Sequence, residues 1–296
     1  MFFNGRLFEA HPLTIANAPP STSVVGSRSL TLAARVRGDW TRALNTFAQE
    51  EQARLSLGNE KRIDGKASQS VAVPVQVMLD GAYGGCSIDI GAYESVLLIA
   101  GGSGATVTLG LLDDLVGRCT KLGRPHGERT RRVEFVWCVR SFGSIAWFAD
   151  ALKELALACE RSNGALDLHV SVYVTCLCNP EAVPDIPNCD VSVYRPAVGK
   201  ILRALVAPPD TENALEASSG STANKKDAED VEEDTPTQTH SLSGKLNWVG
   251  LGGGVGVCAS GPESLIRETQ NAVARLGLTQ GVKLGGIGLH TELFAL

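Results

Sequence analysis

The sequence lacks any long uninterrupted apolar run. Hydrophobic residues make up 44% of its 296 residues, which is enough to form folded cores. The longest apolar stretch, Val96–Leu112, is broken by glycine, serine and threonine and falls short of the ~20 residues that a membrane helix requires. The start, Met1–Arg6, lacks the basic and apolar regions of a secretory signal. We therefore expect no membrane-spanning segment and a cytosolic chain of about two domains.

Positive charge is not in excess either. The formal net charge is −5 at pH 7, so no overall field attracts the chain to nucleic acid or to an anionic membrane. Acidic residues crowd between Pro208 and Ser243, a stretch that is also rich in serine, threonine and asparagine. Such a composition cannot build a core, and it predicts a disordered acidic insertion at residues 208–243.

The spacing of a metal site is missing from the cysteines and histidines. Cys176, Cys178 and Cys189 are unevenly spaced, and the nearest histidine, His169, lies in an alternating strand pattern. No histidine lies on an apolar span, so haem ligation is not expected. We expect no metal, and reduced thiols packed among apolar side chains without disulfides. The remaining cysteines are scattered along the chain: Cys86, Cys119, Cys138, Cys159 and Cys258.

Hydrophobic periodicity divides the chain near residue 93. Before it, alternating segments predict strands at 29–37 and 71–79, and residues 39–54 predict a helix with Asp39 as its N-cap, followed by a polar loop to residue 70. After it, strands alternate with helices, which is typical of a parallel sheet with helical crossovers. The predicted strands are 96–100, 133–139, 166–174, 191–194, 255–258 and 287–293, and the predicted helices are 106–119, 144–161, 198–206 and 262–276.

A glycine-rich turn follows the first of these strands. Val96–Ala100 leads into Gly101-Gly102-Ser103-Gly104 and then into the helical pattern at Thr106. Unpaired amides and the helix dipole favour an anion at such a junction, and the missing side chains let a pyrophosphate approach. A purely structural strand-to-helix turn is the alternative, because Val107 stands where the dinucleotide fingerprint has a third glycine.

The next predicted strand ends in Arg140-Ser141. In a dinucleotide-binding sheet this strand ends beside the adenosine ribose, where an arginine suits the 2′-phosphate of NADPH. Pairing of Arg140 with a surface carboxylate is the alternative. A second anion-binding junction is predicted at Gly38-Asp39-Trp40-Thr41, where Asp39 alone would be a mere helix cap. Two junctions suggest two nucleotides that face each other.

Further motifs follow one another along almost the whole chain. They are His11–Ile15, Gly38–Thr41, Asp80–Gly84, Ala100–Thr106, Trp137–Ser144, Cys258–Glu263 and Gly285–Glu292. In content and order they resemble the flavin and NADPH domains of fungal ferric-chelate reductases and NADPH oxidases. The resemblance implies a β plus α/β fold like ferredoxin-NADP reductase. An incomplete FAD-binding β-barrel at residues 1–92 would precede a parallel-sheet NADPH-binding domain at residues 93–296.

The resemblance also implies roles for particular residues. The flavin would be contacted by His11, Pro12, Leu13 and Thr14, and its pyrophosphate would be held by Gly38, Trp40 and Thr41. The NADPH pyrophosphate would be held by Gly101, Gly102, Ser103, Gly104 and Thr106. The 2′-phosphate would be held by Arg140 and Ser141, and the nicotinamide end by Gly261 and Pro262. Cys258 and Phe294 are the implied catalytic residues, beside the nicotinamide and the flavin. A buried strand aromatic is the alternative for Phe294.

The implied reaction passes hydride from NADPH to FAD. In full-length relatives electrons continue through haem to ferric chelates. A superoxide-producing NADPH oxidase and a catalytically silent NADPH-binding remnant are the alternatives.

Two departures from the family pattern matter. Cys258 lies two residues farther from Gly261-Pro262 than the family cysteine does. Only ten residues precede His11, which the resemblance places on a middle barrel strand, so we expect weak FAD binding and a chain that is either a truncated gene model or a genuinely shortened reductase module. Full-length relatives lie at the cytosolic face of the plasma membrane, and here membrane association would depend on a missing N-terminal domain.

Overall fold

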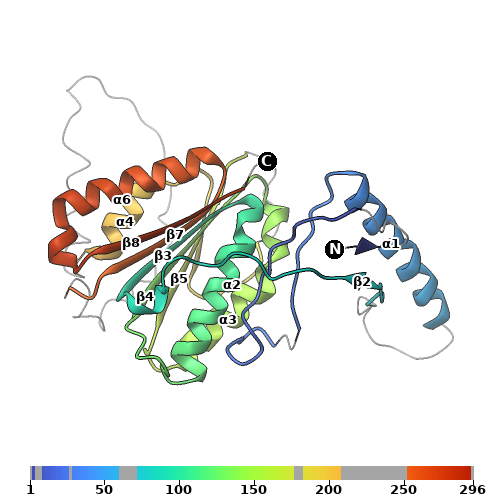
Figure 1. Ribbon diagram of the computed structural model, residues 1–296, viewed down its shortest axis with the longest axis horizontal. Coiled ribbons are helices and arrows are strands. Elements are labelled where there is room, and N and C mark those ends of the chain that lie inside the picture. Colours follow the sequence, from blue (N-terminus) through green and yellow to red (C-terminus); the bar gives the residue numbers. More distant parts are fainter. Residues whose placement is uncertain are drawn as a thin grey trace, which may run out of the picture. The chain divides into compact units, whose positions relative to one another are not determined.

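The computed structural model describes residues 2–3, 9–26, 29–59, 72–176, 183–207 and 252–294. These residues fall into two compact units (Figure 1). Unit 1 comprises Met1–Ala16 and Leu30–Gly85, and unit 2 comprises Asn17–Ser29 and Cys86–Leu296. The predicted acidic insertion at 208–243 lies outside the described residues.

Unit 1 is built around one long helix, α1 (Asp39–Asn59). Its short strands β1 (Phe2–Phe3) and β2 (Val77–Met78) pair antiparallel, and Ile15 forms a single antiparallel bridge with Leu32. The predicted helix is confirmed, but it continues through the first part of the predicted loop. The predicted strands at 29–37 and 71–79 are mostly wrong. Residues 29–37 are largely exposed, and among the described residues of the two segments the pairing is confined to the Leu32 bridge and to β2. A flavin barrel is not visible among the described residues.

Unit 2 contains a six-stranded sheet in which every neighbouring pair is parallel, in the order β6-β5-β4-β3-β7-β8. The prediction of a parallel α/β domain is therefore confirmed. From β3 the chain adds β4, β5 and β6 on one side, and then returns to the other side of β3 for β7 and β8. The strands are β3 (Ser95–Gly101), β4 (Arg132–Val139), β5 (Asp167–Val174), β6 (Cys189–Ser192), β7 (Val255–Gly261) and β8 (Ile287–Leu293).

Helices cover both faces of this sheet (Figure 1). α2 (Ala105–Val116) and α3 (Ala149–Arg161) pack on one face, and α4 (Val198–Val206) and α6 (Glu263–Leu284) on the other. Alternate residues of β3 therefore enter different cores: Leu98 joins the α2 and α3 side chains, and Leu97 joins those of α4 and α6. No helix within the described ranges is both long enough and apolar enough to span a bilayer.

Several helices begin or end at residues other than the predicted ones. The predicted helix at 144–161 begins instead with a 3-10 segment, Phe142–Trp147, and α2 ends in a π-turn at Gly117–Lys121. α6 runs past its predicted end at residue 276, because Leu284 in its last turn is buried against the sheet. It stops at Gly285, whose positive φ of 82° is the usual glycine helix cap.

A loop from the N-terminal part of the chain is anchored on α2. The side chain of Asp113 is fully buried and accepts hydrogen bonds from the backbone amides of Ala18 and Val24, at 2.9 and 2.7 Å. The Ser23 hydroxyl donates to the same carboxylate at 2.7 Å. Sequence periodicity does not reveal this contact, because its partners are about ninety residues apart.

Candidate functional site

The glycine-rich turn lies where β3 passes into α2, at the edge of the sheet where the parallel strands end. We call this the carboxyl edge. Gly102–Gly104 form a 3-10 turn, and no described side chain caps the start of this turn or of α2. The Trp137 indole on β4 donates a hydrogen bond to the Gly102 carbonyl at 3.0 Å, which fixes the turn from the neighbouring strand. The Ala105 amide at the start of α2 donates to the carbonyls of Gly102 and Ser103, so the amides open to an anion at this junction are those of the turn itself.

The glycines allow this turn to pack closely against the end of β7. A Cβ atom on Gly104 would collide with the carbonyl group of Ser260, and one on Gly101 would lie 2.6 Å from Pro262 Cδ. Packing therefore accounts for these two glycines. It does not account for Gly102, which has a φ of 56° and no described atom within 4 Å of an added Cβ. At that position the backbone faces open space, as the approach of a ligand requires.

Ser260 is a candidate site residue that the sequence analysis missed. It lies directly before Gly261-Pro262, its side chain is fully buried, and its hydroxyl has no hydrogen-bond partner among the described residues. Cys258, by contrast, sits farther back in β7, in register with Leu98 and packed in the core beneath α2 and α3. The structure does not bring Cys258 to the carboxyl edge. Counting back one residue from Gly261, rather than matching the cysteine, would have identified Ser260.

Arg140 and Ser141 follow the last residue of β4 and therefore lie at the carboxyl edge. Arg140 is exposed, and no carboxylate in the described part of the chain pairs with it. The predicted alternative, a surface ion pair, is thus not found there. The Ser141 hydroxyl lies 3.2 Å from that of Ser144.

Phe294 joins this edge from β8, since its backbone amide donates a hydrogen bond to the Gly261 carbonyl at 2.9 Å. Its side chain is half-buried. The carboxyl edge thus brings together most of the residues predicted for NADPH: Gly101, Gly102, Ser103, Gly104, Thr106, Arg140, Ser141, Gly261, Pro262 and, beside them, Phe294.

The residues predicted for the flavin lie in unit 1. The rings of His11 and Trp40 are 4.5 Å apart between centroids, and Trp40 is almost fully buried. At the start of α1 the Thr41 hydroxyl accepts hydrogen bonds from the backbone amides of Arg37 and Gly38, at 2.9 and 3.1 Å. The Gly38 amide, which the resemblance places at the flavin pyrophosphate, is therefore engaged by the Thr41 hydroxyl. Pro12, Leu13 and Thr14 lead into the single bridge at residue 15.

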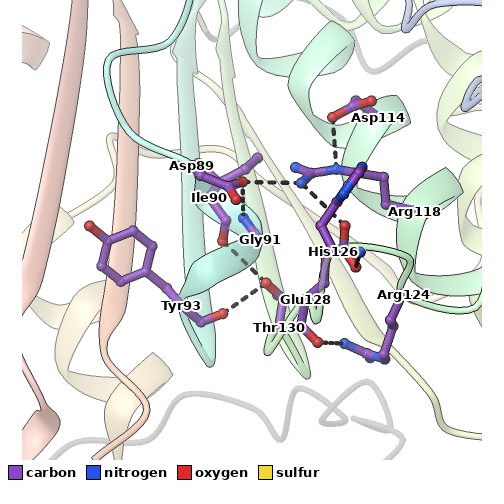
Figure 2. Close-up of polar contacts among 10 residues, drawn as sticks. All are labelled: Asp89, Ile90, Gly91, Tyr93, Asp114, Arg118, Arg124, His126, Glu128 and Thr130. Atoms are coloured by element: carbon purple, nitrogen blue, oxygen red, sulfur yellow. Dashed lines mark hydrogen bonds and ion pairs between the residues drawn. The ribbon is translucent and has the colours of Figure 1, made fainter.

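A polar cluster lies at the opposite edge of the sheet, where the strands begin (Figure 2). Arg118, nearly buried, contacts Asp114 at 2.9 Å, Asp89 at 3.1 Å and Glu128 at 3.4 Å. Burial alone would lower the pKa of Arg118, but the carboxylates outweigh it and raise the pKa. The Thr130 hydroxyl lies close to backbone carbonyls of the segment that enters β3. This cluster ties that segment to the end of α2 and is explained by structure alone.

Comparison with known proteins identifies the family of most of unit 2. Residues 93–274 match the family model described as ferric reductase NAD binding domain. Curated relatives include respiratory burst oxidase homolog protein D of Arabidopsis thaliana, 30% identical over 181 residues, and that of Solanum tuberosum, 29% identical over 180 residues. These matches cover 56% of this chain but 19% and 20% of the relatives, so the chain spans about a fifth of their length. The chain belongs to the ferric reductase NAD binding domain family.

Proposed function

We propose that the chain binds NADPH at the carboxyl edge of unit 2 and is the nucleotide-binding and flavin-binding part of a reductase of the ferric-chelate reductase type. The observation that carries this proposal is the reversal of strand order between β3 and β7. Ligands of open parallel sheets bind outside the carboxyl ends of the strands where the order reverses. The glycine-rich turn and Gly261-Pro262 flank this point.

The residues at the edge suit the parts of NADPH. The amides of the Gly102–Gly104 turn, with the positive end of the α2 dipole, would hold the pyrophosphate. Arg140, exposed and without a described carboxylate partner, would hold the 2′-phosphate through its bidentate guanidinium. The buried hydroxyl of Ser260, which lacks a partner among the described residues, would hydrogen-bond at the nicotinamide end. Ser260 therefore takes the place that the sequence analysis gave to Cys258.

The chemistry requires positioning rather than acid or base groups. NADPH supplies a hydride and FAD accepts it. In this proposal the turn fixes one end of the dinucleotide, Ser260 orients the other, and Phe294 excludes water from the space beside Gly261. Ionisable residues at the edge, such as Arg140, serve binding, and no proton transfer is assigned to them.

FAD fits unit 1 less well than NADPH fits unit 2. The rings of His11 and Trp40 lie 4.5 Å apart, but Trp40 is almost fully buried, and the Thr41 hydroxyl already engages the Gly38 amide that would hold the pyrophosphate. We therefore propose that this chain binds FAD weakly, and that added FAD is needed for activity.

Oxidation of NADPH followed at 340 nm, with added FAD and a ferric chelate, tests the proposal. We expect turnover that depends on both the flavin and the chelate. NADPH binding without turnover under these conditions would indicate a silent remnant and contradict the reductase assignment. An NADPH oxidase is the second candidate, favoured by the names of the plant relatives. Turnover with oxygen as acceptor, and cytochrome c reduction that superoxide dismutase abolishes, would identify it.

A further inference from the structure

Two cysteines and a histidine from distant parts of the sequence meet inside unit 2. Cys86 lies on the segment that enters the unit, Cys258 in the middle of β7 and His290 on β8, directly beside Cys258 in the strand register. One side-chain atom of each lies within 4.8 Å of the others. This group is separate from the carboxyl edge, and the proposed NADPH site does not use it.

We propose that Cys86 and Cys258 are a peroxide-sensitive thiol pair that closes to a reversible disulfide. Cys86 is half-buried, so a small oxidant reaches its sulfur. Cys258 is fully buried, so it reacts with its neighbour rather than with molecules in solution. The pair thus has one accessible and one protected sulfur.

The hydrogen bonds of His290 argue against a metal site here. The Ser87 backbone amide donates to His290 Nδ1 at 3.2 Å, and the Ser87 hydroxyl lies 2.9 Å from the same atom. Nε2 lies 3.2 Å from a carboxylate oxygen of Glu292. Both ring nitrogens are therefore engaged by neighbours. The group also offers three ligand atoms among the described residues, where a structural zinc site takes four.

The surroundings of the two thiols shift their pKa values in opposite directions. The hydrogen bond from the Cys258 thiol lowers the pKa of Cys86 to about 6 against the opposing effect of burial, and the Ile88 backbone and His290 add to the lowering. The hydrogen bond to Cys86 and burial raise the pKa of Cys258. At neutral pH Cys86 is thus mostly the thiolate, which is the reactive form, and Cys258 keeps its proton.

The buried and half-buried thiols Cys119, Cys138, Cys159 and Cys189 differ from Cys86, and burial also raises the pKa of Cys119. Burial raises the pKa of Cys138, Cys159 and Cys189 to about 12 in each case. They remain protonated and unreactive at neutral pH. Oxidation is therefore expected to select the Cys86–Cys258 pair over these buried and half-buried thiols.

The oxidation balances with one molecule of hydrogen peroxide. The Cys86 thiolate attacks one peroxide oxygen, the O–O bond breaks and hydroxide leaves, which forms a sulfenic acid. Once Cys86 is a sulfenic acid, the thiolate that raised the pKa of Cys258 is gone. The Cys258 thiol then gives its proton to the sulfenic hydroxyl as its sulfur attacks the Cys86 sulfur, and the hydroxyl departs as water. Two thiols and one peroxide give one disulfide and two waters.

The disulfide requires the two sulfurs to approach to about 2.05 Å. Cys86 follows Gly84 and Gly85, which have positive φ angles and no described atom within 4 Å of an added Cβ. The backbone beside Cys86 therefore has room to shift, while Cys258 is held in the sheet.

Mass spectrometry of the full chain tests this proposal. After brief exposure to stoichiometric hydrogen peroxide and blocking with N-ethylmaleimide, we expect a cross-linked Cys86–Cys258 peptide that dithiothreitol removes. Cys86→Ser and Cys258→Ser should each abolish it, and the matched control Cys159→Ser should retain it. In the untreated chain, Cys86 alkylation should rise with pH around 6, and Cys258→Ser should move that midpoint upward.

The wild-type measurement alone decides the question if a variant fails to fold. Absence of the cross-link, or a disulfide between other cysteines, would overturn the proposal. So would stoichiometric zinc binding that protects both thiols from alkylation, because the group would then be a metal site.

Discussion

Two glycines of the β3–α2 turn have different roles in its structure. Gly104 allows contact with the β7 backbone, whereas Gly102 leaves the backbone open. Packing thus explains Gly104, whereas Gly102 is left for the proposed ligand, a distinction that sequence spacing alone does not make.

Gly104→Ala tests the packing role at the residue scale. The added methyl group would meet the Ser260 carbonyl and push the turn out of place. We expect a loss of stability of about 1–3 kcal/mol, measured by urea unfolding, and NADPH affinity weakened by at least roughly tenfold, since a displaced turn misplaces the anion-binding amides. Gly277→Ala in α6 is the matched control, because no described atom lies within 4 Å of its added Cβ.

The control should keep wild-type NADPH affinity and gain up to about 1 kcal/mol in stability, because alanine is the better helix former. Equal effects of the two substitutions would show that the turn is not tightly packed on β7.

Sequence analysis predicted the glycine turn and Arg140 because their signals are local. It missed Ser260 and the Cys86–Cys258 contact. The first depends on which residue ends β7, and the second on the register of β7 with β8 and on a segment far away in sequence. Counting back one residue from Gly261 could have found the first, but no short spacing encodes the second.

At the scale of elements, α2 has two functions. Its first turn faces the proposed pyrophosphate site, and Asp113 farther along holds the loop around Ser23. The carboxylate has only acceptors to offer, and its neighbours are all donors.

Asp113→Asn should therefore destabilise the fold. The amide group of asparagine would place a donor against donors in a buried site, and we expect a loss of about 2–4 kcal/mol in urea unfolding. Asp150→Asn, an exposed change in the first turn of α3, should cost less than about 1 kcal/mol. Similar losses for both variants would mean that the loop contributes little to stability.

Elements of unit 2 were predictable because burial on both sides leaves a clear pattern. β3 and β7 are buried throughout, and α3 buries one regular stripe. In unit 1 the alternation of apolar and polar residues at 29–37 does not come from burial, since those side chains are mainly exposed. The predicted end of α6 was wrong because packing of Leu284 extends the helix beyond the last residue of its apolar pattern.

At the scale of the whole molecule, strand order creates the proposed site. Loops after β3 and β7 become neighbours because the chain reverses its direction of growth between them. Helical periodicity predicted the strands and helices, but not this order, which arises from long-range pairing. The residues that match the family model, 93–274, include β3 and β7, which flank the proposed site.

Calorimetric titration with NADPH and NADH, on the wild type and two arginine variants, tests the central claim most directly. Arg140 and Arg131 are both exposed and directly flank β4 at its opposite ends. We predict that the wild type prefers NADPH, and that Arg140→Ala weakens NADPH binding about 10–100-fold while NADH binding is unchanged. Arg131→Ala should change neither. Equal affinities for both dinucleotides, or equal effects of the two substitutions, would contradict an NADPH site at the carboxyl edge.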